Sequence, residues 1–164
     1  MKGGDAVDAF WDSFLYIAFW GVASHFIGQW LPRRWFHPGR GVFACRPWER
    51  NGRAYEKLAI RQWKTKVPDM SLILRDMLKK EVRADNTSAG LFRLATETCV
   101  SETVHVLLIF VTVPLLFRWK SRWGVVFYVV YNVLGNAPYI LIQRYNRPRL
   151  LALAEKKKQK EENA

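Results

Sequence analysis

Three long apolar segments are the feature that most constrains how this chain can fold. They cover residues 9–31, 98–117 and 123–142, and each is close to the ~20 residues that a helix needs to cross the hydrocarbon core of a bilayer. Tryptophans stand near the segment ends, where amphipathic rings settle among lipid headgroups. The pattern predicts an all-α membrane protein with about three transmembrane helices. A soluble bundle of buried helices is the alternative, and the tight apolar hairpin over 98–142 argues against it.

The first apolar segment is expected to stay in the mature chain. It is longer and bulkier than the apolar core of a secretory signal peptide, and no small-residue cleavage site follows it. Asp5 and Asp8 precede it, whereas a signal peptide begins with a basic region. An uncleaved signal anchor is the alternative interpretation.

The charge of the chain indicates which side of the membrane each part faces. A formal net charge of +12 is typical of proteins that bind nucleic acid or an anionic membrane surface, and the apolar segments favour the membrane, so no nucleic-acid partner is expected. Residues 32–96 hold fifteen Lys or Arg against six acids, and the chain after Ile142 is also basic. The positive-inside rule places both stretches on the cytoplasmic side of the cell membrane and the N-terminus outside. The basic link 118–122 then faces outside, unless the second and third segments re-enter the membrane without crossing it.

A single membrane-embedded domain is predicted over residues 1–150, including the cytoplasmic basic region 32–96, and a charged tail follows over 151–164. Residues 155–164 are expected to be frayed or solvated. Apolar residues recur with the helical period over Asp69–Val82, which predicts an amphipathic helix at the membrane interface. Aromatic residues among the charges of the basic region suit a surface that lies on anionic headgroups.

The start of the second segment carries the strongest candidates for chemistry. Glu102 and His105 lie ~60° apart on a helix and Glu97 falls on the other side of His105, and ionisable groups in a membrane segment are costly enough to suggest function. A carboxylate that fixes the imidazole tautomer leaves the other ring nitrogen able to take a proton. A polar contact between helices or with a headgroup would explain the same residues. Carboxylate-bridged metal sites also use a Glu-x-x-His spacing, but they need a second copy, which this sequence lacks.

The third segment has a polar stripe along one helical face, and Pro138 is expected to kink the helix there. Hydrogen bonds between helices explain such a stripe, and so does a substrate-binding groove. The residues of the stripe are Tyr128, Asn132, Asn136, Tyr139 and Gln143.

Two basic motifs suit a phosphate or a lipid headgroup, although a stop signal under the positive-inside rule would look similar. They read RQWKTKVPD at 61–69 and QRYNRPR at 143–149. Their candidate binding residues are Arg61, Trp63, Lys64, Lys66, Asp69, Arg144, Tyr145, Asn146, Arg147 and Arg149. Of the other histidines, His25 is expected to pack or bond within the first helix. The two cysteines, Cys45 and Cys99, have no CxxC spacing, so neither a disulfide framework nor a cysteine metal site is expected.

These motifs together resemble the glycosyl-diaponeurosporenoate acyltransferase family, which makes staphyloxanthin-type carotenoids. The resemblance rests on RQWKTKVPD at 61–69, on ET…E..H at 97, 98, 102 and 105, and on GNAP…QRYNRPRL at 135–150. Their order and spacing and the total length agree from about Pro32 to Leu150. The resemblance implies a membrane enzyme that attaches a fatty acyl group to a sugar hydroxyl of a glycosylated carotenoid or a similar glycolipid.

On this resemblance, the expected donor is a thioester, either acyl-CoA or an acyl carrier protein, and no metal or other cofactor is expected. His105 would be the general base, Glu102 would orient it, and Asn136 or Gln143 would donate to the developing oxyanion. Glu97 is placed with the catalytic residues and Asn132 with the substrate-binding ones. The basic residues expected to hold the donor phosphates are Arg61, Lys64, Lys66, Arg144, Arg147 and Arg149. The alternative function is a non-enzymatic membrane protein that binds anionic lipid or scaffolds a partner complex.

Overall fold

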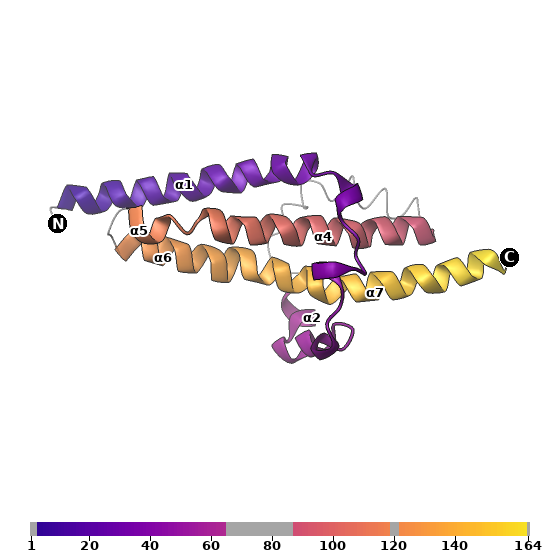
Figure 1. The fold of residues 1–164 in the computed structure, drawn as a ribbon. Coiled ribbons are helices and arrows are strands. Elements are labelled where there is room, and N and C mark those ends of the chain that lie inside the picture. The colour runs from indigo at the N-terminus through magenta and orange to yellow at the C-terminus, as the bar shows by residue number, and fades with distance from the viewer. Residues whose placement is uncertain (1–2, 65–86, 119–121, 164) are drawn as a thin grey trace. The chain divides into compact units, whose positions relative to one another are not determined.

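The computed structural model describes residues 3–64, 87–118 and 122–163, and in these ranges the protein is all-helical, without a strand (Figure 1). The predicted fold class is confirmed to that extent. The chain divides into two compact units. We call residues 1–31 and 101–140 the apolar unit, and residues 32–100 and 141–164 the basic unit.

The apolar unit consists of three helical segments that run side by side (Figure 1). Their elements are α1 (Gly3–Trp30), the second part of α4 (Ser88–Val111), α5 (Leu115–Arg118), α6 (Arg122–Val130), the π-helical η5 (Tyr131–Asn136) and the start of α7 (Ala137–Glu162). The hydroxyl of Tyr16 on α1 donates to the carbonyl oxygen of Val111 at 2.7 Å. Gly124 lets α6 approach α5, because a Cβ at this position would lie 2.1 Å from the carbonyl oxygen of Leu115.

The second apolar segment is helical over a different range from the one predicted. Its helix α4 begins at Ser88, before the predicted start at Thr98, and ends at Val111. Pro114 has no N–H to donate, and a turn separates α4 from α5, in which the carbonyl oxygen of Phe110 accepts from the N–H of Val113 at 3.1 Å. The polar residues at the start of α4 therefore belong to a longer helix than the apolar run suggested.

The third apolar segment contains a π-helix directly before Pro138. In η5 the N–H of Ala137 donates to the carbonyl oxygen of Asn132, five residues earlier. Pro138 follows directly and lacks the N–H that an α-helical turn needs, and wider turns of this kind are frequent at functional sites. The helix then continues as α7 to Glu162. The charged tail is consequently helical up to that residue, and most of its side chains are exposed.

Two helical stretches in the described part of the chain are long and apolar enough to cross a membrane, Ser88–Phe117 and Arg122–Glu162. Only 22% and 11% of their most apolar windows are buried inside the protein, whereas the core helix of a soluble protein would be mostly buried. Helix α1 covers nearly all of the predicted segment 9–31 but is not one of the two, so a third span stays a prediction. The amphipathic helix predicted over 69–82 lies outside the described residues.

The basic unit combines the first part of α4 and most of α7 with a chain of short turns. These turns are η1 (Arg33–Trp35), η2 (Gly41–Phe43), η3 (Pro47–Glu49), η4 (Arg53–Leu58) and the four-residue helix α2 (Ile60–Trp63). Their small core is formed by Tyr55, Ile60 and Tyr145. Gly52 adopts φ 84°, and a Cβ there would lie 2.9 Å from the carbonyl oxygen of Tyr145. Glycine therefore allows the turns to pack directly against α7.

Candidate functional site

A chain of hydrogen-bonded amides reaches His105 in the apolar unit. Nδ1 of His105 lies 3.0 Å from Oδ1 of Asn136, and the imidazole stacks on the ring of Tyr139 with 4.6 Å between centroids. Nδ2 of Asn136 donates to Oδ1 of Asn132 at 2.9 Å. Nδ2 of Asn132 in turn donates to the carbonyl oxygen of Tyr128 at 2.8 Å. Asn132 and Asn136 are both buried.

The direction of each hydrogen bond in this amide chain follows from the group at its far end, the carbonyl oxygen of Tyr128. A carbonyl oxygen only accepts, so Asn132 must turn its NH₂ toward Tyr128 and its oxygen toward Asn136. Asn136 must then present its NH₂ to Asn132 and its oxygen to His105. Nδ1 of His105 therefore carries the hydrogen, and in the neutral ring Nε2 is the nitrogen that can accept a proton. The amide chain thus selects the imidazole tautomer that a general base needs.

Thr112 supports the same orientation, although no sequence pattern pointed to it. Nδ2 of Asn132 also donates to Oγ1 of Thr112 at 3.1 Å, and the Thr112 hydroxyl donates to the carbonyl oxygen of Leu108 at 2.7 Å. The hydroxyl can accept from Asn132 because its own hydrogen is directed to Leu108. In the sequence, a threonine inside an otherwise apolar run was the signal that could have identified Thr112.

The predicted carboxylates of α4 have different surroundings. Glu102 lies one turn before His105 on α4, and its role as the partner of the imidazole stays a prediction, while Asn136 is the group at Nδ1. Glu97 belongs to the basic unit, where the guanidinium of Arg33 donates to both of its oxygens at 2.9 and 3.0 Å. The hydrogen bond to Glu97 raises the pKa of Arg33. Glu97 therefore joins α4 to the turn η1.

In the basic unit, Arg144 is bound to a buried carboxylate. Its Nε donates to Glu49 at 2.9 Å and its Nη1 to the carbonyl oxygen of Val42 at 2.8 Å. Glu49 is 1% exposed and also accepts from the Tyr55 hydroxyl and from the N–H of Arg46. Burial alone would raise the pKa of the Glu49 carboxyl, but the hydrogen bonds from Arg46 and Tyr55 and the charge of Arg144 together lower it. Burial and the bond to Glu49 raise the pKa of Tyr55 to about 12.

Arg147 is held in a similar way. It is 2% exposed, and its guanidinium donates to Oγ1 and to the carbonyl oxygen of Thr98 at 2.8 and 3.1 Å and to the carbonyl oxygen of Phe43 at 3.0 Å. The cavity that Arg144 and Arg147 line has a volume of about 10 Å³, room for a single water at most. A phosphate group would have to displace these contacts. Both arginines therefore brace the turns against the helices of the basic unit.

Three predicted binding residues of the basic unit, Arg61, Lys64 and Arg149, contact Tyr145, whose ring is buried. The guanidinium of Arg149 lies 3.5 Å from the ring centroid, and Nζ of Lys64 lies 4.8 Å from it. Nε of Arg61 donates to the Tyr145 hydroxyl at 3.2 Å. Arg61 and Arg149 both bind Glu56 at 2.6 Å. This cluster leaves Arg61 as its exposed member, with 68% of the side chain accessible.

The other predicted residues are placed as follows. Lys64 donates to Oδ1 of Asn146 at 3.4 Å, Nε1 of Trp63 donates to the carbonyl oxygen of Leu58 at 2.8 Å, and Gln143 is half-buried on α7. Lys66 and Asp69 lie outside the described residues. His25 bonds to Gln29 within α1 at 2.8 Å, which confirms the expectation for that histidine.

Comparison with known proteins agrees with the motifs. A family model described as glycosyl-4,4'-diaponeurosporenoate acyltransferase matches residues 32–156. A protein of that name from Staphylococcus aureus (strain bovine RF122 / ET3-1) is 27% identical over 128 residues, which cover 77% of this chain and 76% of the relative. Its counterpart in strain Newman is 26% identical over 137 residues, covering 83% and 82%. No solved structure matches the chain significantly.

Proposed function

Because the chain belongs to the glycosyl-4,4'-diaponeurosporenoate acyltransferase family and is therefore an acyltransferase, we propose that it acylates a sugar hydroxyl of a glycosylated carotenoid or a similar glycolipid. The names of the curated relatives support this acceptor. The donor in this proposal is a thioester, either acyl-CoA or an acyl carrier protein. The single observation that carries the mechanism is the orientation of the amide chain that ends at His105.

In the proposed reaction, the oxygen of the sugar hydroxyl attacks the carbonyl carbon of the thioester. Nε2 of His105 takes the proton of that hydroxyl at the same time. The tetrahedral intermediate then expels the thiolate, and the imidazolium returns the proton to it, so an ester and a free thiol are formed. The Nδ1 hydrogen stays directed at Asn136 throughout, which keeps the ring in place while it is charged. Glu102 is proposed to stabilise the imidazolium. The second amide hydrogen of Asn136, or the amide of Gln143, is proposed to donate to the oxyanion.

A membrane location is part of the proposal, because the acceptor is a lipid. The two apolar stretches Ser88–Phe117 and Arg122–Glu162 support it, and so do the large apolar side chains on the surface of α1 and α6. We propose that α1 is the third span and that the basic stretches 32–96 and 144–160 face the cytoplasm, where acyl thioesters are made.

The basic residues predicted to bind the donor divide into two groups in this proposal. Arg61 keeps a role in phosphate binding because its side chain is exposed, and Lys64 lies beside it at the Tyr145 cluster. Arg144, Arg147 and Arg149 are proposed to act chiefly by holding the basic unit together. The division follows from the space around each side chain: Arg61 is exposed, whereas Arg144 and Arg147 line a cavity of about 10 Å³.

Lipid analysis tests the proposed function. In cells that make a glycosylated carotenoid, expression of the protein should produce a species heavier by one esterified fatty acid, and His105→Ala should abolish it while the protein still accumulates. Mass spectrometry of extracted lipids measures both. Identical lipid profiles with and without the wild-type protein would contradict this choice of acceptor.

A further inference from the structure

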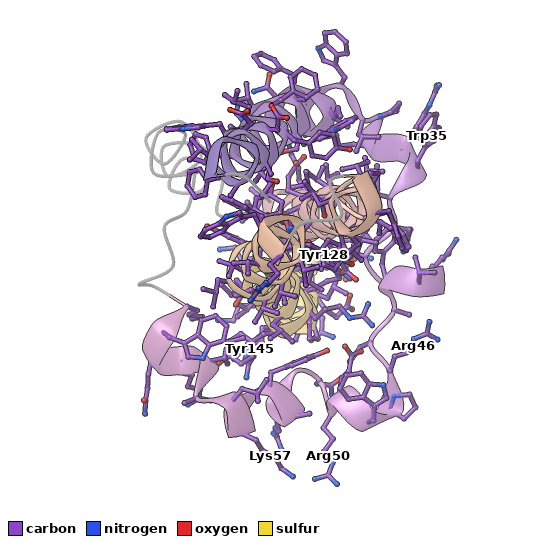
Figure 2. The ribbon with its side chains drawn as sticks, turned by 90° about the vertical axis from the view of Figure 1, so that its left-hand side faces the viewer. Trp35, Arg46, Arg50, Lys57, Tyr128 and Tyr145 are labelled. Atoms are coloured by element: carbon purple, nitrogen blue, oxygen red, sulfur yellow. The ribbon has the colours of Figure 1, made fainter. Side chains whose placement is uncertain are left out.

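A basic cavity lies on the turns of the basic unit, apart from the residues that the sequence motifs singled out. It has a volume of about 600 Å³ and is lined by Trp48, Arg50, Asn51, Arg53, Ala54 and Lys57. This volume is within the range of small-molecule sites, roughly 300–1,000 Å³. Three of its lining residues are cationic and none is acidic. Figure 2 shows Arg50 and Lys57 pointing outward from the ribbon.

The cations of this cavity differ from the other arginines of the basic unit. Arg50, Arg53 and Lys57 are exposed, and in the part of the chain that the structure describes their side chains have no hydrogen-bond or ion-pair partner. Arg144, in contrast, is bound to Glu49. Like charges held close together repel one another, and a bound anion relieves that repulsion.

The backbone beneath these cations is held in an uncommon conformation. Arg50 and Asn51 adopt φ values of 49° and 55°, and Gly52 follows at 84°. For residues other than glycine this conformation is strained, and it persists where surrounding contacts determine it. Here those contacts are Glu49, bound by Arg144, and Gly52, packed against Tyr145. These contacts hold the backbone at Arg50 and Asn51 in one conformation, which lowers the entropy cost of binding a ligand.

We propose that this cavity binds a phosphate-bearing ligand, with Arg50, Arg53 and Lys57 as its cationic contacts. Arginine and lysine are the usual protein ligands of phosphate, and the exposed ring of Trp48 supplies a flat apolar wall beside them. Two sources have this chemistry. One is a nucleotide-containing thioester donor, which rests on the proposed function; it has several phosphates, so these cations would add to Arg61 and not replace it. The other is the headgroup of an anionic phospholipid.

Equilibrium dialysis of the purified full chain against coenzyme A, in neutral detergent, tests the first source. The double variant Arg53→Gln/Lys57→Gln should bind coenzyme A at least 10-fold more weakly, because a charge-assisted contact is worth about that factor or more. Lys156→Gln/Lys160→Gln removes the same charge from exposed residues of α7 and should bind like the wild type. Raising the salt concentration should weaken wild-type binding more than binding by the Arg53/Lys57 variant.

Native mass spectrometry of the same variants with phosphatidylglycerol or phosphatidylcholine tests the second source. Loss of phosphatidylglycerol binding in the Arg53/Lys57 variant, with coenzyme A binding intact, would identify the ligand as a lipid headgroup. Unchanged binding of both ligands relative to the Lys156/Lys160 control would overturn the proposal.

The failure of this site can be told apart from the failure of the proposed function. His105→Ala should bind coenzyme A or phosphatidylglycerol as the wild type does, because the cavity does not include His105. Binding at the cavity without any acyl transfer by the wild type would leave the site standing and remove the function. If Arg53→Gln/Lys57→Gln changes neither the rate of acyl transfer nor its dependence on donor concentration, the cavity does not bind the donor. That result would leave only the phospholipid headgroup as its ligand.

Discussion

At the scale of single residues, the buried carboxylate of Glu49 connects the turns of the basic unit to α7. It is 1% exposed and accepts hydrogen bonds from Arg46, Tyr55 and Arg144. Removing one partner of a buried ion pair typically costs about 3–5 kcal/mol, because the other charge is left uncompensated. Arg144, which its motif predicted to hold a phosphate, is the ion-pair partner of this carboxylate.

Glu49 should make the stability of the protein depend on acidic pH. Its pKa in the folded state is lower than the ordinary 4.5, so the folded chain keeps this carboxyl charged where the unfolded chain has bound a proton. Its contribution is therefore complete above that value and is lost as the pH falls toward the folded pKa. Thermal unfolding in detergent from pH 7 to 3 should show this loss in the wild type and a flatter profile in Glu49→Gln, which is less stable at pH 7.

A control for this prediction comes from a second carboxylate of the same unit. Glu162 pairs with Lys158 at 3.7 Å, with side chains 61% and 59% exposed, and exposed pairs contribute little, so Glu162→Gln should change the pH profile much less. Parallel profiles for the wild type and Glu49→Gln would show that Glu49 does not hold the basic unit together.

At the scale of elements, the π-helix η5 and the amide chain belong together. Both Asn132 and Asn136 lie in η5, and the chain Tyr128–Asn132–Asn136 ends at Nδ1 of His105. The polar stripe of the third segment predicted that these amides share a face. The spacing could not reveal the π-turn, because it depends on how Pro138 is accommodated within the folded helix. Nor did it place Asn136 at Nδ1 of His105, because the sequence argument gave the orienting role to Glu102 and assigned Asn136 to the oxyanion.

Asn132 should act on catalysis only through the imidazole. Asn132→Ala removes the group that directs Asn136, so Asn136 can turn its NH₂ toward His105 and favour the wrong tautomer. Turnover should fall roughly 10–100-fold, the scale on which outer partners of an imidazole matter at metal sites, with little change in KM for the donor. ¹⁵N NMR of histidine-labelled protein should show the Nε2-protonated form of His105 increasing.

The matched comparison is Thr112→Val. It removes the second acceptor of Asn132 but leaves the Tyr128 carbonyl to set the direction of the chain, so the tautomer and turnover should change less. Equal tautomer populations in the wild type and Asn132→Ala would mean that the amide chain does not select the tautomer.

At the scale of the whole molecule, length and hydropathy predicted the all-helical class correctly and located the apolar stretches. Helix ends were less predictable: α4 begins at Ser88 and α7 continues to Glu162, because polar and charged residues extend a helix without an apolar signal. Phosphate binding by the basic motifs stays a prediction. The sequence does not distinguish a buried arginine such as Arg147 from an exposed one such as Arg53. The difference depends on which carbonyl and carboxylate oxygens the folded turns place beside each guanidinium.

Membrane orientation is testable with a native thiol. Cys45 is exposed and Cys99 is buried. If residues 32–96 face the cytoplasm, a membrane-impermeant maleimide should label Cys45 only after the cells are permeabilised, whereas a cysteine introduced at Asp8 should be labelled in intact cells. Labelling of Cys45 in intact cells would reverse the orientation and place the basic region away from cytoplasmic thioesters.

The general-base role of His105 is tested most directly by turnover of purified His105→Ala with a thioester donor and a glycolipid acceptor. We predict a fall of about 10²–10⁴-fold, the usual effect of losing such a group. Glu102→Gln should cost less, and the double variant should be no worse than His105→Ala because the two residues act as one unit. The control is His25→Ala, which should retain wild-type turnover because His25 bonds to Gln29 within α1. Near-normal turnover by a folded His105→Ala protein would contradict the mechanism.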